Sequence, residues 1–442
     1  MLTRVAPEIT EKGAAVRVAD AAFPAPFRSG LEYAAPARGP WNIVHVGMLI
    51  PEAHEIFVCA QGCLRGVVLT AAEMGAQERF STVEIRENNV LDGDMENLIV
   101  DGVTDVLQKL PQLPRAVLVY TSCIHHFMGC DLELCYRELR SRFPGVAFTD
   151  CYMNPIMRKS GLTPDQLMRK QLYSLLEPRE KRDDCVSIVG NCFPTDETSE
   201  LMRMLRAGGK TVKDITLCRS YDEYLSMAEG AFCISMLPPA RAGGDELERR
   251  LGQKHLYLSA CWGYGENSEN LDLLAQTLNL PRGDDAQAIA LAETALQKAN
   301  AVIGSAPVAL DYTATPRPLG LARLLLEHGF HVTAVFADSF TDEERADFDW
   351  LQKNAPELVI RATVEVKCRV LPRETETRTL AIGQKAAYFT GTRNFVNIVE
   401  GGGAWGFDGI SRMAARMIDA WLHEKDPRTQ IQPKGLGCGC CL

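Results

Sequence analysis

The 442-residue chain lacks the features that mark membrane, secreted and nucleic-acid-binding proteins. It has no apolar run of the ~18 or more residues that a membrane-spanning helix needs, and Met1–Glu8 has no apolar core of a signal peptide. The formal net charge of -10 argues against a phosphate-binding surface. We therefore expect a cytoplasmic protein without membrane or nucleic-acid partners.

The sequence also lacks the common nucleotide-binding and hydrolase motifs. Gly209-Lys210-Thr211 looks like the end of a Walker A loop, but that motif needs Gly where this chain has Met204. The chain has no Gly-x-Ser-x-Gly elbow and no His-Glu-x-x-His helix, which argues against a hydrolase. Gly401–Gly406 is Gly-rich but lacks the dinucleotide-binding spacing, so it either approaches a ligand with its backbone or forms a tight turn.

Cysteine, in contrast, is abundant: the chain has fifteen. In a cytoplasmic protein most thiols stay reduced, and the odd number argues against a full disulfide framework. Four of them lie inside apolar or regular patterns, and we interpret these as small buried hydrophobic residues: Cys135, Cys185, Cys233 and Cys368.

Strand and helix signals alternate along most of the chain. The predicted strands include Asn42–Met48, Ala116–Tyr120, Cys185–Gly190, Ala231–Met236, His331–Ala337 and Ala381–Phe389, and the predicted helices include Thr195–Arg206, Pro318–His328 and Ile410–His423. This alternation predicts an α/β fold of three Rossmann-like domains with parallel sheets. The predicted segments are an irregular arm (1–40), three domains (41–183, 184–299 and 300–424) and a Cys-rich tail (425–442).

Three cysteines stand where strands are predicted to end. Cys59 and Cys63 lie where a strand-like segment gives way to a helix that begins near Cys59, and Cys123 ends the run Val-Leu-Val-Tyr-Thr-Ser-Cys. Since one βαβ unit separates them, strand ends can bring all three thiols to the sheet edge where open α/β sheets bind ligands. Thiolates that meet there in an intracellular protein suggest an iron–sulfur cluster or a metal.

Further residues are weaker candidates for the same chemistry. His125 and His126 follow Cys123 directly, and each is either a proton donor or cluster ligand, or a histidine packed at a helix start. Cys151 follows a predicted strand and is a reserve ligand at the same edge. Other cysteines at strand ends or in the Gly-rich tail are possible ligand contacts or structural residues: Cys192, Cys261, Cys438, Cys440 and Cys441.

Four segments occur in an order and spacing typical of one protein family: Leu91–Leu98, Val119–Glu133, Glu246–Leu280 with its Trp-Gly-Tyr-Gly, and Trp405–Ile410. Over residues 40–422 the chain resembles the subunits of nitrogenase component 1, whose relatives include tetrapyrrole reductases and cofactor-assembly scaffolds. The resemblance implies a [4Fe-4S] cluster, or a larger P-cluster-like one, held between two similar subunits. The partner would be a second copy of the chain or a sister nitrogenase-like subunit.

The resemblance also assigns ligand positions. Each nitrogenase subunit gives three cysteines to the shared cluster, and Cys63 matches the first and Cys123 the last. The middle position falls near Phe80-Ser81, where this chain has no cysteine. Cys59, one helical turn before Cys63, is the predicted replacement, and Cys130, which stands where the family has an aspartate, is another candidate.

Two further positions bear on the reaction. The Cys and the His that hold the large iron cofactor of nitrogenase fall, by spacing, near Met236 and near Val396-Asn397, so we do not expect dinitrogen reduction. Without a Walker A loop, the chain is expected to receive electrons from a separate ATP-dependent iron–sulfur reductase. The expected activity is reduction of an unidentified small molecule bound where the domains meet. The alternatives are a scaffold for cluster assembly and an α/β ligand-binding protein with structural cysteines.

Overall fold

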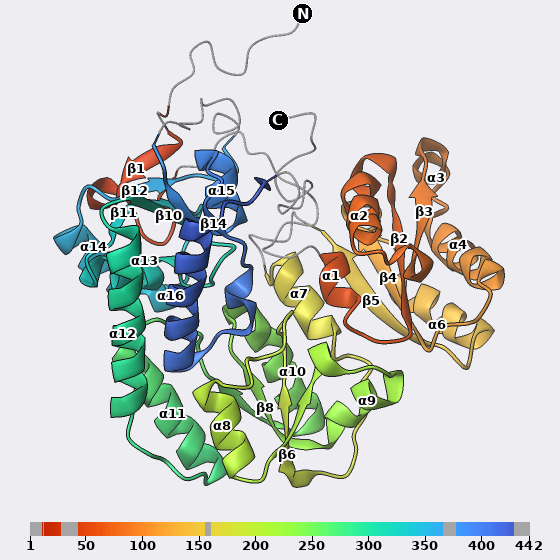
Figure 1. The fold of residues 1–442 in the computed structure, drawn as a ribbon. Helices are drawn as coiled ribbons and strands as arrows, with labels where there is room; N and C mark the ends of the chain where they lie inside the picture. Colours follow the sequence, from red (N-terminus) through yellow and green to blue (C-terminus); the bar gives the residue numbers. More distant parts are fainter. Residues whose placement is uncertain (1–10, 12, 28–42, 155–160, 366–376, 428–442) are drawn as a thin grey trace, which may run out of the picture. The chain divides into compact units, whose positions relative to one another are not determined.

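The structure is a computed structural model that describes residues 11, 13–27, 43–154, 161–365 and 377–427. The chain divides into two compact units. The first unit comprises Ala35–Pro194 and Gly209–Leu258, and the second comprises Met1–Ala34, Thr195–Gly208 and Ser259–Leu442. Three sheets built from βα repeats run through the two units (Figure 1), which confirms the predicted α/β fold with parallel sheets.

The first unit contains two four-stranded parallel sheets. One has the order β3 (Phe80–Ile85), β2 (Ala53–Ala60), β4 (Ala116–Ser122), β5 (Ala147–Met153). The other has the order β7 (Thr211–Asp214), β6 (Arg182–Ile188), β8 (Gly230–Ser235), β9 (Lys254–Tyr257). The helices of this unit are α1 (Ile43–Gly47), α2 (Gln61–Glu73), α3 (Glu87–Asp92), α4 (Met95–Lys109), α5 (Cys123–Met128), α6 (Leu132–Arg142), α7 (Pro164–Gln171), α9 (Tyr221–Ser226) and α10 (Arg241–Leu251).

The second unit contains one six-stranded sheet. Its order is β1 (Ala15–Arg17), β12 (Val359–Arg361), β11 (His331–Phe336), β10 (Pro307–Asp311), β13 (Leu380–Ile382), β14 (Phe395–Val396), and β1 alone runs antiparallel to its neighbour. Its helices are α8 (Glu200–Ala207), α11 (Tyr264–Leu278), α12 (Ala286–Ile303), α13 (Pro318–Glu327), α14 (Arg345–Asn354), α15 (Gln384–Thr390) and α16 (Gly406–Leu422). The long helices α12 and α16 lie side by side (Figure 1).

Alternation along β2 gives its sheet two buried faces, as is usual for a parallel sheet covered by helices. Phe57 and Cys59 point into one apolar core, which α1, α2 and α7 cover. Ile56 and Val58 point into the opposite core, which α4 and α6 cover. The core on the Cys59 face also includes Cys233 of β8 in the second sheet and Tyr224 of α9, so the two sheets of this unit share one interior.

Two predicted strands are wrong. Asn42–Met48 was expected to be a strand, but Ile43–Gly47 forms helix α1, and the first strand of the sheet is Ala53–Ala60. A short apolar run fits a buried helix as well as a strand, and here the later run pairs with strands on both sides. Ala381–Phe389 is a strand only as far as Ile382, because Gly383 adopts φ 109° and α15 begins at Gln384.

Other elements match the sequence prediction more closely. Three elements end within one residue of the predicted limits: β8, β11 and α13. β4 differs from its predicted limits by two residues and α16 by four. Residues Ala15–Arg17 of the expected irregular arm form the short strand β1. The predicted domain limits at 183, 299 and 424 remain a prediction. None of the helices in the described ranges combines the length and apolar character that crossing a membrane requires. Cys368 and the tail cysteines Cys438, Cys440 and Cys441 lie outside the described residues.

Candidate functional site

Strands β2 and β4 end at the same sheet edge. They are parallel neighbours with Val58 opposite Thr121, so the turn after Ala60 and the turn after Ser122 lie side by side. Cys59 is the penultimate residue of β2, Cys63 lies in the first turn of α2, and Cys123 is the first residue of α5. The helix expected to begin near Cys59 begins two residues later, at Gln61, because the strand continues to Ala60.

The three thiols differ in exposure but influence one another electrostatically. Cys59 is fully buried, whereas Cys63 and Cys123 are partly exposed. Burial raises the pKa of Cys59 well above its usual range, and the neighbouring thiols of Cys63 and Cys123 raise it further. Burial and Cys123 likewise raise the pKa of Cys63. The edge therefore gathers three thiols whose thiolate forms would repel one another, and a bound cation would relieve that repulsion.

The donor set suits a cluster better than a single ion. Within the described residues, no group of three or more His, Cys, Asp or Glu side chains is positioned to hold a metal ion. In an iron–sulfur cluster each cysteine binds a different iron, so the thiols need not converge on one point. Thiolate is the usual ligand of such clusters, and three neighbouring thiols at one edge fit that chemistry.

The middle position assigned by spacing lies at the wrong end of its strand. Phe80 and Ser81 begin β3 and stand opposite Glu55 and Ile56, in the first half of β2. Because β2 and β3 are parallel, the start of β3 lies at the edge opposite Cys63. The residue of β3 that stands beside Cys59 is Glu84.

Cys130 lies between α5 and α6, next to a carboxylate. Burial raises its pKa, and Glu96 raises it further. Glu96 also accepts a hydrogen bond from the backbone N–H of Asp131 at 2.9 Å, and its carbonyl oxygen lies 3.8 Å from the sulfur of Cys135. A negative carboxylate beside a thiol disfavours the thiolate, so this environment disfavours metal binding by Cys130.

Cys151 lies within β5 rather than after it. It stands opposite Tyr120, is fully buried, and its pKa is raised by burial and by nearby acidic groups. The predicted position at the end of a strand is therefore wrong by two residues, because β5 continues to Met153.

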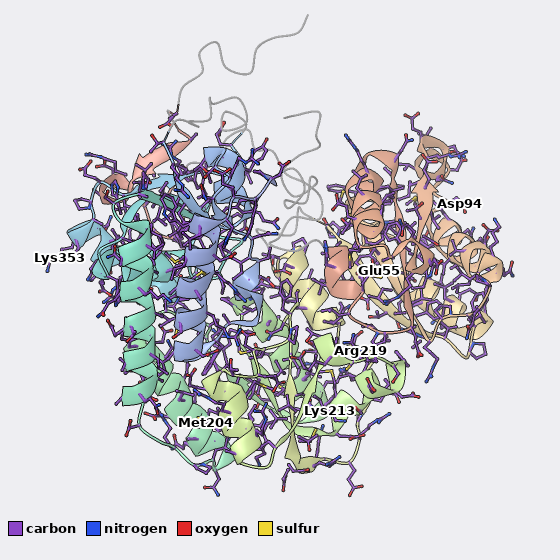
Figure 2. The ribbon with its side chains drawn as sticks, in the orientation of Figure 1. Glu55, Asp94, Met204, Lys213, Arg219 and Lys353 are labelled. Atoms are coloured by element: carbon purple, nitrogen blue, oxygen red, sulfur yellow. The ribbon has the colours of Figure 1, made fainter. Side chains whose placement is uncertain are left out.

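A buried carboxyl group that was not among the sequence candidates lies beneath this edge. Glu55 of β2 is 1% exposed, its Oε1 lies 3.4 Å from the Tyr120 hydroxyl, and burial raises its pKa well above the usual range. Figure 2 labels Glu55, on the strand that carries Cys59. Tyr120 stacks on Phe57 with ring centroids 4.0 Å apart. The sequence signal for a buried carboxyl group was the Glu that directly precedes the apolar residues Ile-Phe-Val-Cys.

The two histidines after Cys123 have different environments. His125 is 2% exposed, and its Nδ1 accepts a hydrogen bond from the backbone N–H of Ser122 at 3.1 Å. Burial lowers its pKa to about 4, so its ring is neutral near pH 7 and carries its proton on Nε2. That nitrogen is buried without a hydrogen-bond partner among the described residues. His126 is exposed and packs edge-on to Phe127.

The remaining sequence candidates lie elsewhere. Cys192 follows β6 and is partly exposed, and Cys261 is buried before α11, where its thiol lies 3.2 Å from Asn267 Oδ1. Neither the pKa of Cys59 nor that of Cys63 is influenced by these two thiols. The positions assigned to cofactor ligands, Met236 and Val396, hold buried apolar side chains.

Exposed apolar side chains lie on the helices that begin at the cysteine edge. On α5, Phe127 is 71% exposed and Met128 is 40% exposed. On α2, Val68 and Leu69 are about equally exposed, at 42% and 40%. A run of exposed apolar side chains beside a chemically distinctive edge is typical of a surface that a protein partner covers.

Comparison with known proteins identifies the family. The family model described as nitrogenase component 1 type oxidoreductase matches residues 41–422. The fold is similar to a solved structure described as nitrogenase Cp1 at pH 6.5, with a TM-score of 0.65 and 14% identity over 89% of this chain and 94% of that chain. It is also similar to one described as nitrogenase Cp1 at pH 5, with a TM-score of 0.59 and 13% identity over 95% of this chain and 96% of that chain. No curated protein sequence matches the chain. Because the family model spans most of the chain, and the solved structures share its fold, this protein belongs to the nitrogenase component 1 type oxidoreductase family.

Proposed function

We propose that this protein is a nitrogenase-like iron–sulfur reductase. Cys59, Cys63 and Cys123 hold an iron–sulfur cluster, and electrons come from a separate ATP-dependent iron–sulfur reductase. The substrate is a small molecule, and a cluster bound at these cysteines would supply one-electron transfer. The observation that carries the proposal is the electrostatic coupling of three thiols at one edge of the first sheet.

The local backbone favours a negatively charged cluster at this edge. Helix α2 begins at Gln61, directly after β2, and its N-cap residue is Ala60, which offers no side-chain acceptor. The first N–H groups of a helix carry partial positive charge and lack partners within the helix. Those of α2 would therefore stabilise the charge of a thiolate-ligated cluster next to Cys63.

Exposed apolar surface supports two protein partners. Leu69 shares a face of α2 with Gly62 and Gly66, where added side chains would meet open space, so a second nitrogenase-like subunit could approach this helix closely. That subunit is a second copy of the chain or a sister subunit. Phe127 and Met128 on α5 form a separate apolar surface beside Cys123, and we assign it to the electron-donating reductase.

A scaffold for cluster or metallocofactor assembly is the second candidate. The partial exposure of Cys63 and Cys123 favours this role, because a cluster that is passed on must be reached by the acceptor's ligands. Turnover separates the two functions. A reductase consumes electrons continuously with the ATP-dependent partner. A scaffold turns over at most one equivalent of electrons per cluster and then transfers its iron to an acceptor protein.

Iron and sulfide content test the proposal directly. Protein purified without oxygen should be brown and contain iron and acid-labile sulfide, and Cys63→Ser and Cys123→Ser should lose most of both. Cys218→Ser is the matched control, since Cys218 is also partly exposed in the same unit and serine keeps its hydrogen bond to the Asp214 carbonyl. A colourless wild-type protein from anaerobic expression, or equal iron loss in the control, would contradict the assignment.

Association provides an independent test. A cluster shared between subunits exists in full only in the assembled state, so cluster binding and dimerisation are linked. Cys63→Ser and Cys123→Ser should weaken the dimer together with the loss of iron, and Cys130→Ser should do so less. Anaerobic sedimentation read beside iron content measures both. An iron-free Cys63→Ser variant that dimerises with unchanged affinity would place the cluster away from the interface.

A further inference from the structure

Two of the three edge thiols are accessible to a reagent in solution. Cys63 and Cys123 are partly exposed, whereas Cys59 is fully buried in an apolar core. All three are free thiols in the structure. The proposed cluster needs the thiolates of Cys63 and Cys123, so a reaction that joins these two sulfurs would remove both ligands at once. The Cys63–Cys123 pair is therefore a point at which oxidation would control the binding of a cluster.

The backbone brings both residues of this pair close to Ala60. β2 and β4 are parallel neighbours with Val58 opposite Thr121. Continued by two residues, this register places Cys123 beside Ala60, and neighbouring strands lie about 4.8 Å apart. Cys63 is the third residue of α2, so its Cα lies within about one helical turn, 5.4 Å, of Ala60. A disulfide joins Cα atoms about 4.4–6.8 Å apart, which is the scale of these separations.

The thiol groups themselves are also neighbours. Burial raises the pKa of Cys63, and the charge of Cys123 raises it further, an effect that acts between groups that lie near each other. Thiol–disulfide exchange begins with a thiolate that the reagent can reach. Cys59 does not meet this requirement, because it is buried and its pKa is raised well above the usual range. The two partly exposed thiols are therefore the reactive pair at this edge.

We propose that Cys63 and Cys123 form a disulfide in the cluster-free protein and that this bond blocks cluster loading. The oxidant is a low-molecular-weight disulfide. One thiolate of the pair attacks it, which gives a mixed disulfide and releases the first small thiolate. The second thiolate of the pair then attacks the protein sulfur of the mixed disulfide, which forms the Cys63–Cys123 bond and releases the second small thiolate. Two electrons pass from the pair to the oxidant, and the two protons of the pair end on the two small thiols.

The bond acts as a switch on cluster loading, and this part of the inference rests on the proposed function. A cluster ligand must be a thiolate, and neither sulfur of a disulfide is one. Of the three edge thiols only Cys59 would remain, and a single thiolate does not hold a cluster. A thiol reductant reverses the exchange and restores both ligands. The cluster-free protein would therefore accept a cluster only under reducing conditions.

Exchange with glutathione tests the disulfide itself. Reduced, cluster-free, full-length protein is equilibrated without oxygen in about 1 mM each of oxidised and reduced glutathione. Free thiols are then alkylated, and mass spectrometry of a digest identifies linked peptides. More than half of the molecules should carry the Cys63–Cys123 link, because two neighbouring thiols have an effective concentration of about 1 mM or more. Cys63→Ser should instead give a mixed disulfide of glutathione with Cys123. Cys218→Ser, which removes another partly exposed thiol of the same unit, should leave the link unchanged.

Cluster transfer tests the switch. A loaded iron–sulfur scaffold protein donates its cluster without free sulfide or a small thiol, both of which would reduce the disulfide. Oxidised protein should accept at least about fivefold less iron than protein treated with dithiothreitol and then freed of it. A link in fewer than half of the molecules, a link through Cys59, or equal iron in the two samples would overturn the inference. Reduced protein that accepts no iron would contradict the proposed cluster, and with it the switch on loading, but not the disulfide, so the two failures are distinguishable.

Discussion

Gly47 tests whether helix α1 packs on the polar core below the cysteine edge as the structure describes. A Cβ at this position would lie 2.2 Å from Glu55 Oε1 and 2.3 Å from the Tyr120 hydroxyl oxygen, where ordinary contact begins at 3.4 Å. The overlap is therefore about 1 Å with each of two fully buried side chains, neither of which can turn toward solvent. Overpacking of this kind costs about 3 kcal/mol. The gain in helix propensity from Gly to Ala is at most about 1 kcal/mol, so Gly47→Ala should destabilise the first unit by about 2 kcal/mol or more.

Gly66→Ala is the matched control for this substitution. Gly66 lies inside α2, and a Cβ there meets nothing within 4 Å, so in the cluster-free monomer alanine should stabilise the unit by about 0.5–1 kcal/mol. Urea denaturation followed by circular dichroism compares the two variants with the wild-type protein. The opposite signs of the two effects are the test. If Gly47→Ala is as stable as wild type, α1 does not sit against Glu55 and Tyr120, and the description of the polar core is wrong.

Four single side chains give further predictions. Burial lowers the pKa of His54 and of His125 to about 4, below the unfolded value of about 6.5. The contribution of each neutral ring to folding stability is therefore fully present above pH 6.5 and is lost as the pH falls through 4. Between these two pH values, each histidine should lower the unfolding free energy by up to about 1.4 kcal/mol per pH unit as the pH falls. Urea titrations at several pH values in this range measure the decline, and His125→Asn should make the decline less steep. Burial raises the pKa of Glu55, so its effect on stability has the opposite pH dependence. Its contribution to folding stability is full below the unfolded pKa of about 4.3 and is lost as the pH rises toward the folded pKa. Glu55→Gln should remove that decline of about 1.4 kcal/mol per pH unit in the same titrations, and an unchanged pH dependence would show that Glu55 is ionised in the folded protein. Phe127→Ser should change the unfolding free energy by less than about 0.5 kcal/mol yet slow reduction by the electron donor in stopped-flow measurements. Leu422 is another exposed apolar side chain (59%, against 71% for Phe127), and Leu422→Ser should leave that reduction rate unchanged.

The overall fold follows from the sequence where apolar runs are bounded by clear turn signals. Ala231–Met236 and His331–Ala337 are short and apolar, with a glycine within two residues before each and a proline or aspartate within two residues after it. Both strands form within one residue of the predicted limits. The prediction fails where a run has no such boundary. Ile43–Gly47 is apolar enough for a central strand, but Ala53–Ala60 takes that place because it pairs with β3 and β4 at once. Pairing is a long-range property that local periodicity does not contain.

The candidate site was predictable in part for a similar reason. Cysteines at strand ends can be found by reading along the chain, and the pairing of β2 with β4 brings Cys59 and Cys123 to neighbouring strand ends. The spacing argument for Phe80-Ser81 fails because it counts residues without knowing strand direction and register. Cys151 was misplaced by the length of β5, and the unpartnered Nε2 of His125 depends on tertiary burial that no sequence pattern reports.

Cys59 shows how a buried apolar core and a charged site can occupy the same position. Burial and the neighbouring thiols raise its pKa, so in the metal-free protein the group is a neutral thiol near pH 7 and packs as a small hydrophobic side chain. If Cys59 binds iron, it must lose that proton, and the positive charge of the metal then replaces water as the stabiliser of the thiolate. Metal loading at this depth would therefore release a proton at neutral pH. Cys63 and Cys123 are partly exposed, so incoming iron would reach them first, and Cys59 would be the ligand that fixes the cluster against the core.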